Sequence, residues 1–503
     1  MAANATAAAV PTNGAVARPA SAIAWQPCHA EYPGSECATI QAPLDYAGPK
    51  GATVGLTIAR TKATDPAKRR GVLFIFPGGP GGSGVDRVMT ADRRYGQALR
   101  EAFDIVSYDQ RGVYRSRQIL CDRKVLEDGV SLLPTTADGY QQVLGHNTSV
   151  GKDCRTRNGE LTYHADTTTL VRDIDLVRAS LGEQQLSAYG SSYGTQVGQQ
   201  YAELFPGRIR ALVLDANMDH SITSASEYVA SASAALETSF EKFAAWCATA
   251  AKCALKGRDV PKVWEELYAK ATAGTLKEVG KGIQITPGRM RSTAFAAMYS
   301  PKADWIWLSQ VLAAWADGTP QPWQTHAPTP PKPQIPEGLA QNSYQTIWCS
   351  DWRWAGVRNI NDWNKVVQEA NRRAPHTRLS EFYSDVTSCQ GWPGPVRNPQ
   401  HRLRVKGAPT ILFANSVHDV ATPYSWATGA KKQIPGSVLL TYEGVGHGTY
   451  AASRCAAKLI ESYLLDLKAP ADGTRCPDEA AGIGARSAGE YLVPDEGRQP
   501  VRH

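Results

Sequence analysis

A serine midway between two glycines is the pattern in this chain with the clearest chemical meaning. Residues 190–194 read Gly-Ser-Ser-Tyr-Gly, which places Ser192 between Gly190 and Gly194. A hydroxyl becomes a nucleophile when a nearby base can remove its proton. The G-x-S-x-G spacing predicts a sharp turn from a strand into a helix, which exposes the central hydroxyl. Ser192 is therefore the candidate nucleophile.

The flanking residues have the composition that such a turn requires. Residues 183–189 suit a short buried strand, and residues 195–205 are typical of a helix. Glycine is needed on both sides of the serine because a Cβ in so tight a turn would collide with its neighbours. The backbone N–H of Tyr193 would then lie at the start of the helix, beside the hydroxyl.

A glycine-rich run follows an earlier apolar strand. Residues 71–76 form a β-branched and aromatic stretch, residues 77–84 read Pro-Gly-Gly-Pro-Gly-Gly-Ser-Gly, and residues 103–109 predict the next strand. Glycine runs are often flexible surface loops. Acyl transfer, however, needs backbone N–H groups close to a developing oxyanion, and glycine allows that approach. We expect the N–H of Gly79, with Gly78 as the alternative, to pair with that of Tyr193.

A candidate base and its carboxylate partner follow two later strands. Residues 409–415 predict a strand that precedes Asp419, and residues 437–442 predict another that leads to His447. The order Ser, Asp, His is that of an α/β-hydrolase triad. His447 would take the proton of the serine and Asp419 would orient the imidazole. His418 is the competing histidine. Because it precedes the aspartate instead of ending a strand, we interpret it as structural or pocket-lining.

Seven motifs along the chain together resemble one known family. They are Gly-Gly-Pro-Gly-Gly-Ser-Gly at 78–84, Tyr-Asp-Gln-Arg-Gly at 108–112, Gly-Ser-Ser-Tyr-Gly at 190–194, Ile-Trp-Cys-Ser-Asp at 347–351, Cys-Gln-Gly-Trp-Pro at 389–393, Asp-Val-Ala-Thr-Pro at 419–423 and Gly-His-Gly at 446–448. On these residues the chain resembles the secreted tripeptidyl aminopeptidases of actinomycetes, relatives of proline iminopeptidase among the α/β-hydrolases. The resemblance covers nearly the whole chain.

This resemblance implies an exopeptidase that releases short peptides from a free N-terminus, although some members are better described as esterases. Two positions depart from the pattern. Proline iminopeptidases usually carry a histidine before the glycine run, where this chain has Pro77. A glycine is expected after Asp215, where the chain has Ala216. Both departures lie near the expected substrate and bear on specificity.

Composition narrows the classes of partner. The net charge of +7 comes from 54 basic and 47 acidic residues, without the basic block that nucleic-acid binding would require. No run of 18 apolar residues exists, which argues against a membrane span. The sequence shows no metal-ligand set, and the mechanism needs no cofactor. We therefore expect a monomer that acts on a peptide or a small ester.

The ten cysteines favour disulfides and an oxidising compartment, because no C-x-x-C pair is present. Connectivity is formally open, and proximity suggests Cys28 with Cys37, Cys121 with Cys154, Cys247 with Cys253, Cys349 with Cys389, and Cys455 with Cys476. The first ten residues lack the basic and apolar regions of an intact signal peptide. We expect a secreted protein in a form without that peptide.

The order of predicted elements indicates an α/β-hydrolase fold with an inserted, mainly helical cap. Strands and helices alternate early and late in the chain, which builds a mostly parallel sheet covered on both faces. The expected parts are a disordered leader at 1–24, a first core segment at 25–218, a helical cap at 219–405, a second core segment at 406–480 and an irregular tail at 481–503.

The cap would roof Ser192 and supply the substrate pocket. It is rich in tryptophan, and we expect Trp348 and Trp352, with Trp354, to line an apolar subsite beside Asp351. An aminopeptidase must also bind an ammonium group, for which a desolvated carboxylate is the natural partner. Asp351 is the favoured anchor, and Glu443 and Asp215 are the alternatives. Arg111 is interpreted as structural, pinning the oxyanion loop.

Two classes of function remain open. The first is a serine hydrolase that cleaves peptides from a free N-terminus, with an esterase as a variant that uses the same triad. The second is a hydrolase-fold binding protein without catalysis, which a complete triad and glycine loop argue against. A serine at the elbow excludes the epoxide hydrolases and dehalogenases, which use an aspartate there.

Overall fold

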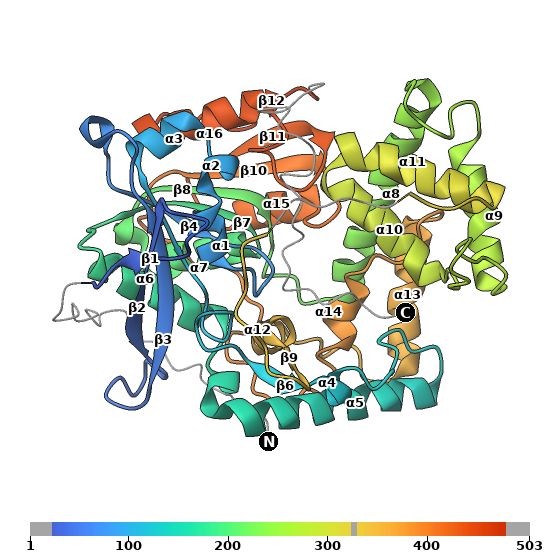
Figure 1. Cartoon of the computed structure of the whole chain (residues 1–503), viewed down its shortest axis with the longest axis horizontal. Helices are drawn as coiled ribbons and strands as arrows, with labels where there is room; N and C mark the ends of the chain where they lie inside the picture. Colours follow the sequence, from blue (N-terminus) through green and yellow to red (C-terminus); the bar gives the residue numbers. More distant parts are fainter. Residues whose placement is uncertain (1–22, 323–328, 479–503) are drawn as a thin grey trace, which may run out of the picture.

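The computed structural model describes residues 23–322 and 329–478 of the 503-residue chain. Of the expected leader and tail, residues 1–22 and 481–503 lie outside the described residues. Within these residues, ten strands form one sheet in the order β1-β2-β3-β5-β4-β7-β8-β10-β11-β12 (Figure 1). The strands are β1 (Gln26–Pro27), β2 (Ser35–Pro43), β3 (Thr53–Thr61), β4 (Val72–Phe76), β5 (Asp104–Tyr108), β7 (Leu186–Ser192), β8 (Ile209–Asn217), β10 (Ile411–His418), β11 (Val438–Val445) and β12 (Arg475–Cys476).

The sheet is antiparallel at one edge and parallel elsewhere. β1, β2 and β3 pair antiparallel, and β3 pairs antiparallel with β5. From β5 to β12 every neighbouring pair is parallel. Parallel strands covered on both faces are apolar throughout instead of alternating. β4, with the sequence Val-Leu-Phe-Ile-Phe, accordingly has every residue buried.

Helices cover both faces of this sheet. Phe74 and Phe76 of β4 belong to a core cluster that also contains residues of α6 (Thr167–Ser180) and α7 (Tyr193–Leu204). Leu73 and Ile75 of the same strand face the opposite cluster, which contains residues of α1 (Gly84–Met89), α3 (Gln97–Ala102) and α16 (Arg454–Asp466). This three-layer arrangement is the α/β-hydrolase architecture that the sequence predicts.

The chain leaves the sheet twice, and the two excursions pack together. The first, residues 113–163, contains β6 (Leu120–Asp122), α4 (Arg123–Leu126) and α5 (Ala137–Asn158). The second, residues 219–405, contains β9 (Leu339–Gln341), which pairs antiparallel with β6. Asn147 of α5 also donates to the carbonyls of Thr387 and Gln390. The first excursion falls inside the range 25–218 that the sequence assigns to the core.

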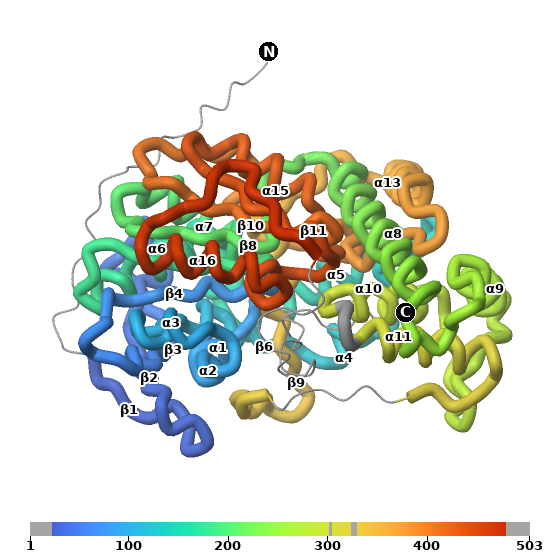
Figure 2. The backbone as a smooth tube through the Cα atoms, turned by 90° about the horizontal axis from the view of Figure 1, so that it is seen from above, coloured from blue at the N-terminus to red at the C-terminus, as the bar shows by residue number. Residues whose placement is uncertain are grey.

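Helices make up most of the second excursion (Figures 1 and 2). They are α8 (Ala225–Thr249), α9 (Val260–Thr272), α10 (Pro287–Tyr299), α11 (Pro301–Asp317), α12 (Ser343–Asp351), α13 (Ile360–Arg373) and α14 (Tyr383–Thr387). Two short helices complete the core, α2 (Ala91–Arg94) and α15 (Tyr424–Lys431). Helices α8 to α11 lie at the side of the molecule away from the antiparallel edge, as Figure 1 shows.

One strand end differs from expectation. β10 continues beyond Asn415 through Ser416 and ends at His418. The sequence-based reason for setting His418 aside, that it does not end a strand, is therefore wrong. The strand runs further because β10 and β11 remain paired as far as His418 and Val445, with an irregularity after Ser416.

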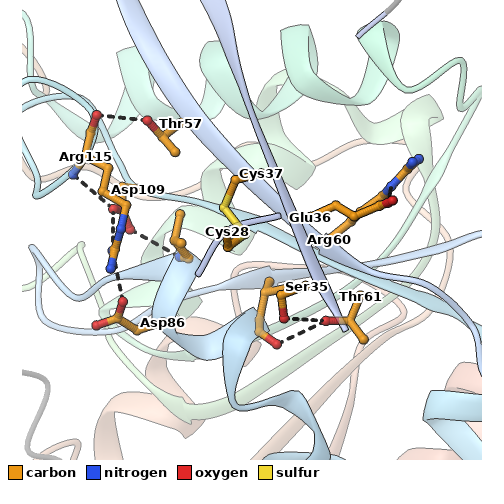
Figure 3. The surroundings of a disulfide bond; sticks show 12 residues. Cys28, Ser35, Glu36, Cys37, Thr57, Arg60, Thr61, Asp86, Asp109 and Arg115 are labelled. Atoms are coloured by element: carbon orange, nitrogen blue, oxygen red, sulfur yellow. Dashed lines mark hydrogen bonds and ion pairs between the residues drawn. A yellow bond between two sulfur atoms is a disulfide. The ribbon is translucent and has the colours of Figure 1, made fainter. Parts of the chain in front are cut away.

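Five disulfides link the cysteines in the five pairs that sequence proximity favours. Figure 3 shows the bond between Cys28 and Cys37, which joins the segment of β1 to β2. Disulfides of this number are typical of proteins that fold in oxidising compartments. Among the described residues, no helix is long and apolar enough to span a membrane.

Candidate active site

The three triad candidates lie at the same edge of the sheet. Ser192 is the last residue of β7, Asp419 directly follows β10, and His447 lies two residues after β11. The strands β7, β8, β10 and β11 are consecutive and parallel, so their carboxyl ends meet at one edge. In open parallel sheets this is the edge at which ligands bind. The fold therefore brings together three residues that are far apart in the sequence.

Ser192 has the strained backbone of a nucleophile elbow. Its φ of 58° and ψ of −128° lie in a region that residues with a side chain rarely adopt. A Cβ at Gly194 would lie 2.1 Å from the carbonyl oxygen of Phe76, and a Cβ at Gly190 would lie 2.5 Å from that of Gly194. Both glycines are thus sterically required. The contact with Phe76 also packs the first turn of α7 against the start of the glycine run.

The glycine run turns back on itself directly after β4. The N–H of Gly82 donates to the carbonyl of Gly78, and Gly79 has a φ of 112°. A Cβ at Gly79 would lie 2.9 Å from the backbone nitrogens of Gly81 and Gly82. Because Gly194 touches Phe76, this loop begins beside the N-terminus of α7, to which Tyr193 belongs. The proposed oxyanion donors, Gly79 and Tyr193, come from these two adjoining segments.

The imidazole of His447 is bound to the carboxylate of Asp419. Nδ1 of His447 lies 2.9 Å from Oδ1 and 3.1 Å from Oδ2 of Asp419. Asp419 is fully buried, and its oxygens also accept from the N–H groups of Ala421 and Thr422 and from the Thr422 hydroxyl. An acceptor at Nδ1 fixes the tautomer in which Nε2 can take a proton.

Sequence reasoning missed two neighbours of this pair. The hydroxyl of Thr422 lies 3.4 Å from Nδ1 of His447 and bridges it to Asp419. Thr422 follows Asp419 by three residues, a spacing typical of local turns, and this was the available signal. From the second excursion, the carbonyl of Tyr299 accepts from the backbone N–H of His447, and the two rings pack edge to face. Nothing in the local sequence indicates the contact with Tyr299.

Asp215 holds the loop after His447 and is not available to a ligand. It is fully buried and accepts from the N–H groups of Thr449 and Tyr450 and from the hydroxyl of Tyr189. The next residue, Ala216, has a φ of 66°. The left-handed backbone explains why glycine is the expected residue at this position.

Asp351 is not placed to anchor a substrate ammonium, which corrects the expectation from the sequence. It is the last residue of α12 and its side chain is fully buried. Four donors already surround its carboxylate, namely the N–H and hydroxyl of Thr167 and the side-chain amides of Gln196 and Asn398. Burial, followed by the nearby carboxylate of Asp166, raises the pKa of Asp351 to about 8.

Trp348 and Trp352 are packed inside the second excursion, so the expectation that they line an apolar subsite is wrong. Each is only 1% exposed, and their rings stack on each other at 4.7 Å. Trp354 stacks on Trp352 in turn and is likewise buried. Large aromatic rings gain most by complete burial, and this stack fills the space between α12, α8 and α14.

Glu443 lies on β11 and is part of an ion pair at the sheet edge. Its side chain is 37% exposed and is bound to Nε of Arg475 on β12. The hydrogen bond from Arg475 is the main cause that lowers the pKa of Glu443. Glu443 is therefore an ionised carboxylate with a cation already beside it. None of the three carboxylates that the sequence nominated as an ammonium anchor stands open and unpaired.

Arg111 does not contact the glycine run, contrary to the sequence-based interpretation. Its buried guanidinium binds Asp173 of α6 through Nε and Nη2, and it donates to the carbonyls of Pro43, the last residue of β2, and of Leu44. It therefore fixes the antiparallel edge to α6. In the same Tyr-Asp-Gln-Arg-Gly motif, Asp109 binds the glycine run, which is the role that the sequence suggested for Arg111.

Asp109 fixes the helical end of the glycine run. Its Oδ1 accepts from the hydroxyl of Ser83 at 2.5 Å and from the N–H of Val85. Arg115 forms ion pairs with Asp109 and with Asp86, as Figure 3 shows. The buried carboxylate thus ties the end of the run to the loop after β5. Among the described residues, no group of three or more histidine, cysteine or acidic side chains could hold a metal ion.

Comparison with known proteins agrees with this geometry. A family profile described as the α/β-hydrolase fold matches residues 71–326, just over half of the chain, and a profile described as TAP-like protein matches residues 378–476. Serine protease Hip1 of Mycobacterium tuberculosis is 28% identical over 483 residues, covering 90% of this chain and 91% of that protein.

Two further relatives match over similar lengths. Tripeptidyl aminopeptidase of Streptomyces lividans is 29% identical over 497 residues, covering 93% of this chain and 89% of that protein. Carboxylesterase B of Mycobacterium tuberculosis is 27% identical over 473 residues, covering 90% of this chain and 89% of that protein. With the strained serine elbow, the buried Asp419–His447 pair and the profile match in agreement, the chain belongs to the α/β-hydrolase fold family.

Proposed function

We propose that this protein is a secreted serine hydrolase that releases short peptides from free N-termini through an acyl-enzyme on Ser192. The observation that carries the proposal is that a strained serine elbow and the Asp419–His447 pair lie at the same edge of the sheet. The five disulfides support a protein that works outside the cytosol. We propose further that it acts as a monomer and has no nucleic-acid partner.

The mechanism follows from the hydrogen bonds at the site. Asp419 accepts the Nδ1 proton of His447, so Nε2 can remove the hydroxyl proton as Ser192 attacks the substrate carbonyl. The oxygen of the tetrahedral intermediate accepts from the N–H groups of Tyr193 and Gly79. Protonated His447 then gives its proton to the leaving amine. A water molecule, activated in the same way, hydrolyses the acyl-enzyme and restores Ser192.

The cap would act as the roof over the acyl-enzyme. We propose that it comprises residues 219–405 together with the first excursion, 113–163, because β6 and β9 pair and α5 binds the carbonyls of Thr387 and Gln390. The core would then be the rest of 25–218 with 406–480. The bond from His447 to the carbonyl of Tyr299 supports a roof in direct contact with the base.

Peptides are favoured as substrates by the two relatives named as a protease and an aminopeptidase, each similar over about nine-tenths of this chain. The relative named carboxylesterase B supports a second candidate, an esterase with the same triad. The two differ in their need for a free amine near the scissile bond. The three carboxylates considered as ammonium anchors, Asp351, Asp215 and Glu443, already have partners. The requirement for a free amine in the substrate is therefore decided by experiment.

The test compares peptides that differ only at the N-terminus. Purified protein is given a series of tripeptide-to-hexapeptide substrates, each with a free and an acetylated N-terminus, beside a simple aryl ester. We expect the free peptides to be cleaved and the acetylated peptides to resist, with the Ser192→Ala variant slower by at least ~10³ in kcat. Mass spectrometry of the products gives the length released.

Each alternative predicts a different pattern. Equal cleavage of free and acetylated peptides would refute the exopeptidase, and turnover of the ester alone would establish the esterase. A loss of less than tenfold in Ser192→Ala would show that another residue is the nucleophile. Labelling by a fluorophosphonate that disappears in Ser192→Ala gives an independent check of the same assignment.

A further inference from the structure

A chain of hydrogen bonds joins the end of cap helix α12 to the first turn of α7. The hydroxyl of Tyr193 lies 2.5 Å from the hydroxyl of Thr167, which in turn is bound to Oδ2 of Asp351. All three residues are fully or almost fully buried. Tyr193 is the residue whose backbone N–H is proposed to bind the oxyanion. The chain of bonds thus connects a carboxylate of the cap to the side chain of an oxyanion donor.

The direction of these bonds is fixed by the donors present. Oδ1 of Asp351 accepts from the N–H of Thr167 and the amide of Asn398, each at 2.9 Å. Oδ2 accepts from the hydroxyl of Thr167 and, at 3.2 Å, from the amide of Gln196. When Asp351 is ionised, Thr167 gives its single hydroxyl proton to the carboxylate and can only accept from Tyr193. Tyr193 therefore donates toward the carboxylate.

The same carboxylate holds α7 at a second point. Gln196 lies one turn after Tyr193, and its amide donates to both Asp351 and the hydroxyl of Thr167. Two side chains of the first turn of α7 are therefore bound to one buried group. The rotation of that turn decides where the N–H of Tyr193 points. Oxyanion donors must be held in place before the charge develops, since their effect depends on preorganisation.

We infer that Asp351 is a positioning residue of the cap, which acts through Thr167 to orient Tyr193 as an oxyanion donor. The inference rests on the proposed acyl-transfer function and deepens it. A carboxylate suits this position because both of its oxygens can accept from the four donors around it. An asparagine there would offer N–H groups toward Thr167, reversing the Thr167 hydroxyl and leaving Tyr193 without its acceptor. Removal of an acceptor for a buried hydroxyl frees that side chain to move.

Protonation of Asp351 would have the same effect as the asparagine. Burial and the nearby carboxylate of Asp166 raise the pKa of Asp351 to about 8, so its charge changes in the range where serine hydrolases work. The charged or titratable groups around it come from α6, α7 and the loops beside them, and are Asp166, Tyr193, His220, Arg397 and His401. Of these, burial lowers the pKa of His220 to about 3, so it stays neutral.

Ionisation of Asp351 should raise kcat. Above about pH 8 the carboxylate is ionised and accepts from Thr167, while below that pH it gains a proton and the bond from Tyr193 is lost. We therefore expect kcat of the wild-type enzyme to rise as the pH passes through about 8. In Asp351→Asn this upper step should be absent, because amide groups do not titrate there.

The experiment measures kcat and KM of Asp351→Asn between pH 6 and 9.5. At pH 9 we expect kcat to fall by about tenfold or more while KM changes by less than about twofold, because the lost interaction serves the transition state. Asp385→Asn is the matched control. Asp385 is also a buried cap carboxylate, which accepts from Tyr228 and Tyr344, and its variant should keep the wild-type pH profile.

A second set of variants decides the matter if Asp351→Asn fails to fold. Thr167→Val removes the hydroxyl at nearly constant shape and should lower kcat as Asp351→Asn does, whereas Thr167→Ser keeps the hydroxyl and should restore it. The single variant Tyr193→Phe should also lower kcat. Adding Asp351→Asn to Tyr193→Phe should cause less further loss than Asp351→Asn causes in the wild type, because only the bond from Gln196 remains to be removed.

The failure of this inference can be told apart from failure of the proposed function. If wild-type turnover depends on Ser192 but Asp351→Asn and Thr167→Val keep kcat and the upper pH step, the positioning role is refuted and the hydrolase stands. Equal losses of kcat in Asp351→Asn and Asp385→Asn would also refute it, because the effect would then not be specific to Asp351. Absence of Ser192-dependent turnover in the wild type would instead remove the proposed function.

Discussion

At the scale of single residues, the site depends on backbone conformations that side chains normally disfavour. Ser192 and Ala216, at the ends of the neighbouring strands β7 and β8, both have positive φ angles. For a residue with a Cβ this conformation costs roughly 1–2 kcal/mol relative to glycine. At Ser192 this conformation forms the turn from β7 into α7. Ala216 directly follows Asp215, whose carboxylate binds the loop after His447. The strained backbone at Ala216 therefore lies beside the residue that holds this loop in place.

The strain at Ala216 can be measured by exchange with glycine. Ala216→Gly relieves the strained backbone but loses a buried methyl group and adds freedom to the unfolded chain. Ala211→Gly in the same strand, where the backbone is ordinary, suffers the losses without the relief. In urea unfolding we expect Ala211→Gly to cost about 1–2 kcal/mol more than Ala216→Gly. Equal costs would mean that Ala216 is not strained.

At the scale of elements, the elbow is a contact between backbones. The first turn of α7 lies so close to the end of β4 that only glycine fits at position 194. The same closeness brings Tyr193 beside the glycine run, whose other end is held by Asp109. Helix α7 is held from the cap side by Asp351. The position of one helix N-terminus is thus determined by a strand, a loop and the cap together.

Gly194→Ala tests the contact between backbones. Its Cβ would lie 2.1 Å from the carbonyl oxygen of Phe76, and neither main chain can move without disturbing the sheet. We expect the variant to lose about 3 kcal/mol or more of stability and its activity. Gly145→Ala is the matched control, since that glycine of α5 has open space around it. A helical alanine there should stabilise by roughly 0.5–1 kcal/mol.

At the scale of the whole molecule, two excursions from the sheet form one covering layer. They are joined by the β6–β9 pair, and the second contacts the core through Tyr299 at the base and through Asp351 at the nucleophile helix. Disulfides stabilise this layer internally. One links β6 to α5, and another links α12 to Cys389, two residues after α14.

Two disulfides of the cap close loops of different length and should contribute different amounts to the free energy of unfolding. Cys349 and Cys389 are 40 residues apart, whereas Cys247 and Cys253 are 6 apart. If each bond acts by restricting the unfolded chain, the first contributes about 4 kcal/mol and the second about 2 kcal/mol. Paired Cys→Ser variants, compared by denaturant unfolding, should show this order. The reverse order would mean that native-state effects dominate.

The sequence predicted the strands and the triad candidates more completely than it predicted the cap. The strands β4, β5, β7, β10 and β11 were predicted because continuous apolar runs have few alternatives in a protein of this size. Ser192 was found because its glycines are a local steric requirement, and the cysteine pairs because they are close in sequence. The helix α10, the contact of Tyr299 with His447 and the burial of Asp351 were not predicted.

The sequence alone determined the class of fold, the order of serine, aspartate and histidine, and the steric need for glycine at 190 and 194. These properties are local, because they depend on neighbouring residues and on the period of apolar side chains. Only the tertiary structure decided that the tryptophans pack in the cap core, that Asp109 and not Arg111 holds the glycine run, and that Asp351 faces α7. The physical reason is that a carboxylate or an indole has many possible partners. Which one it meets depends on the packing of segments far apart in the chain.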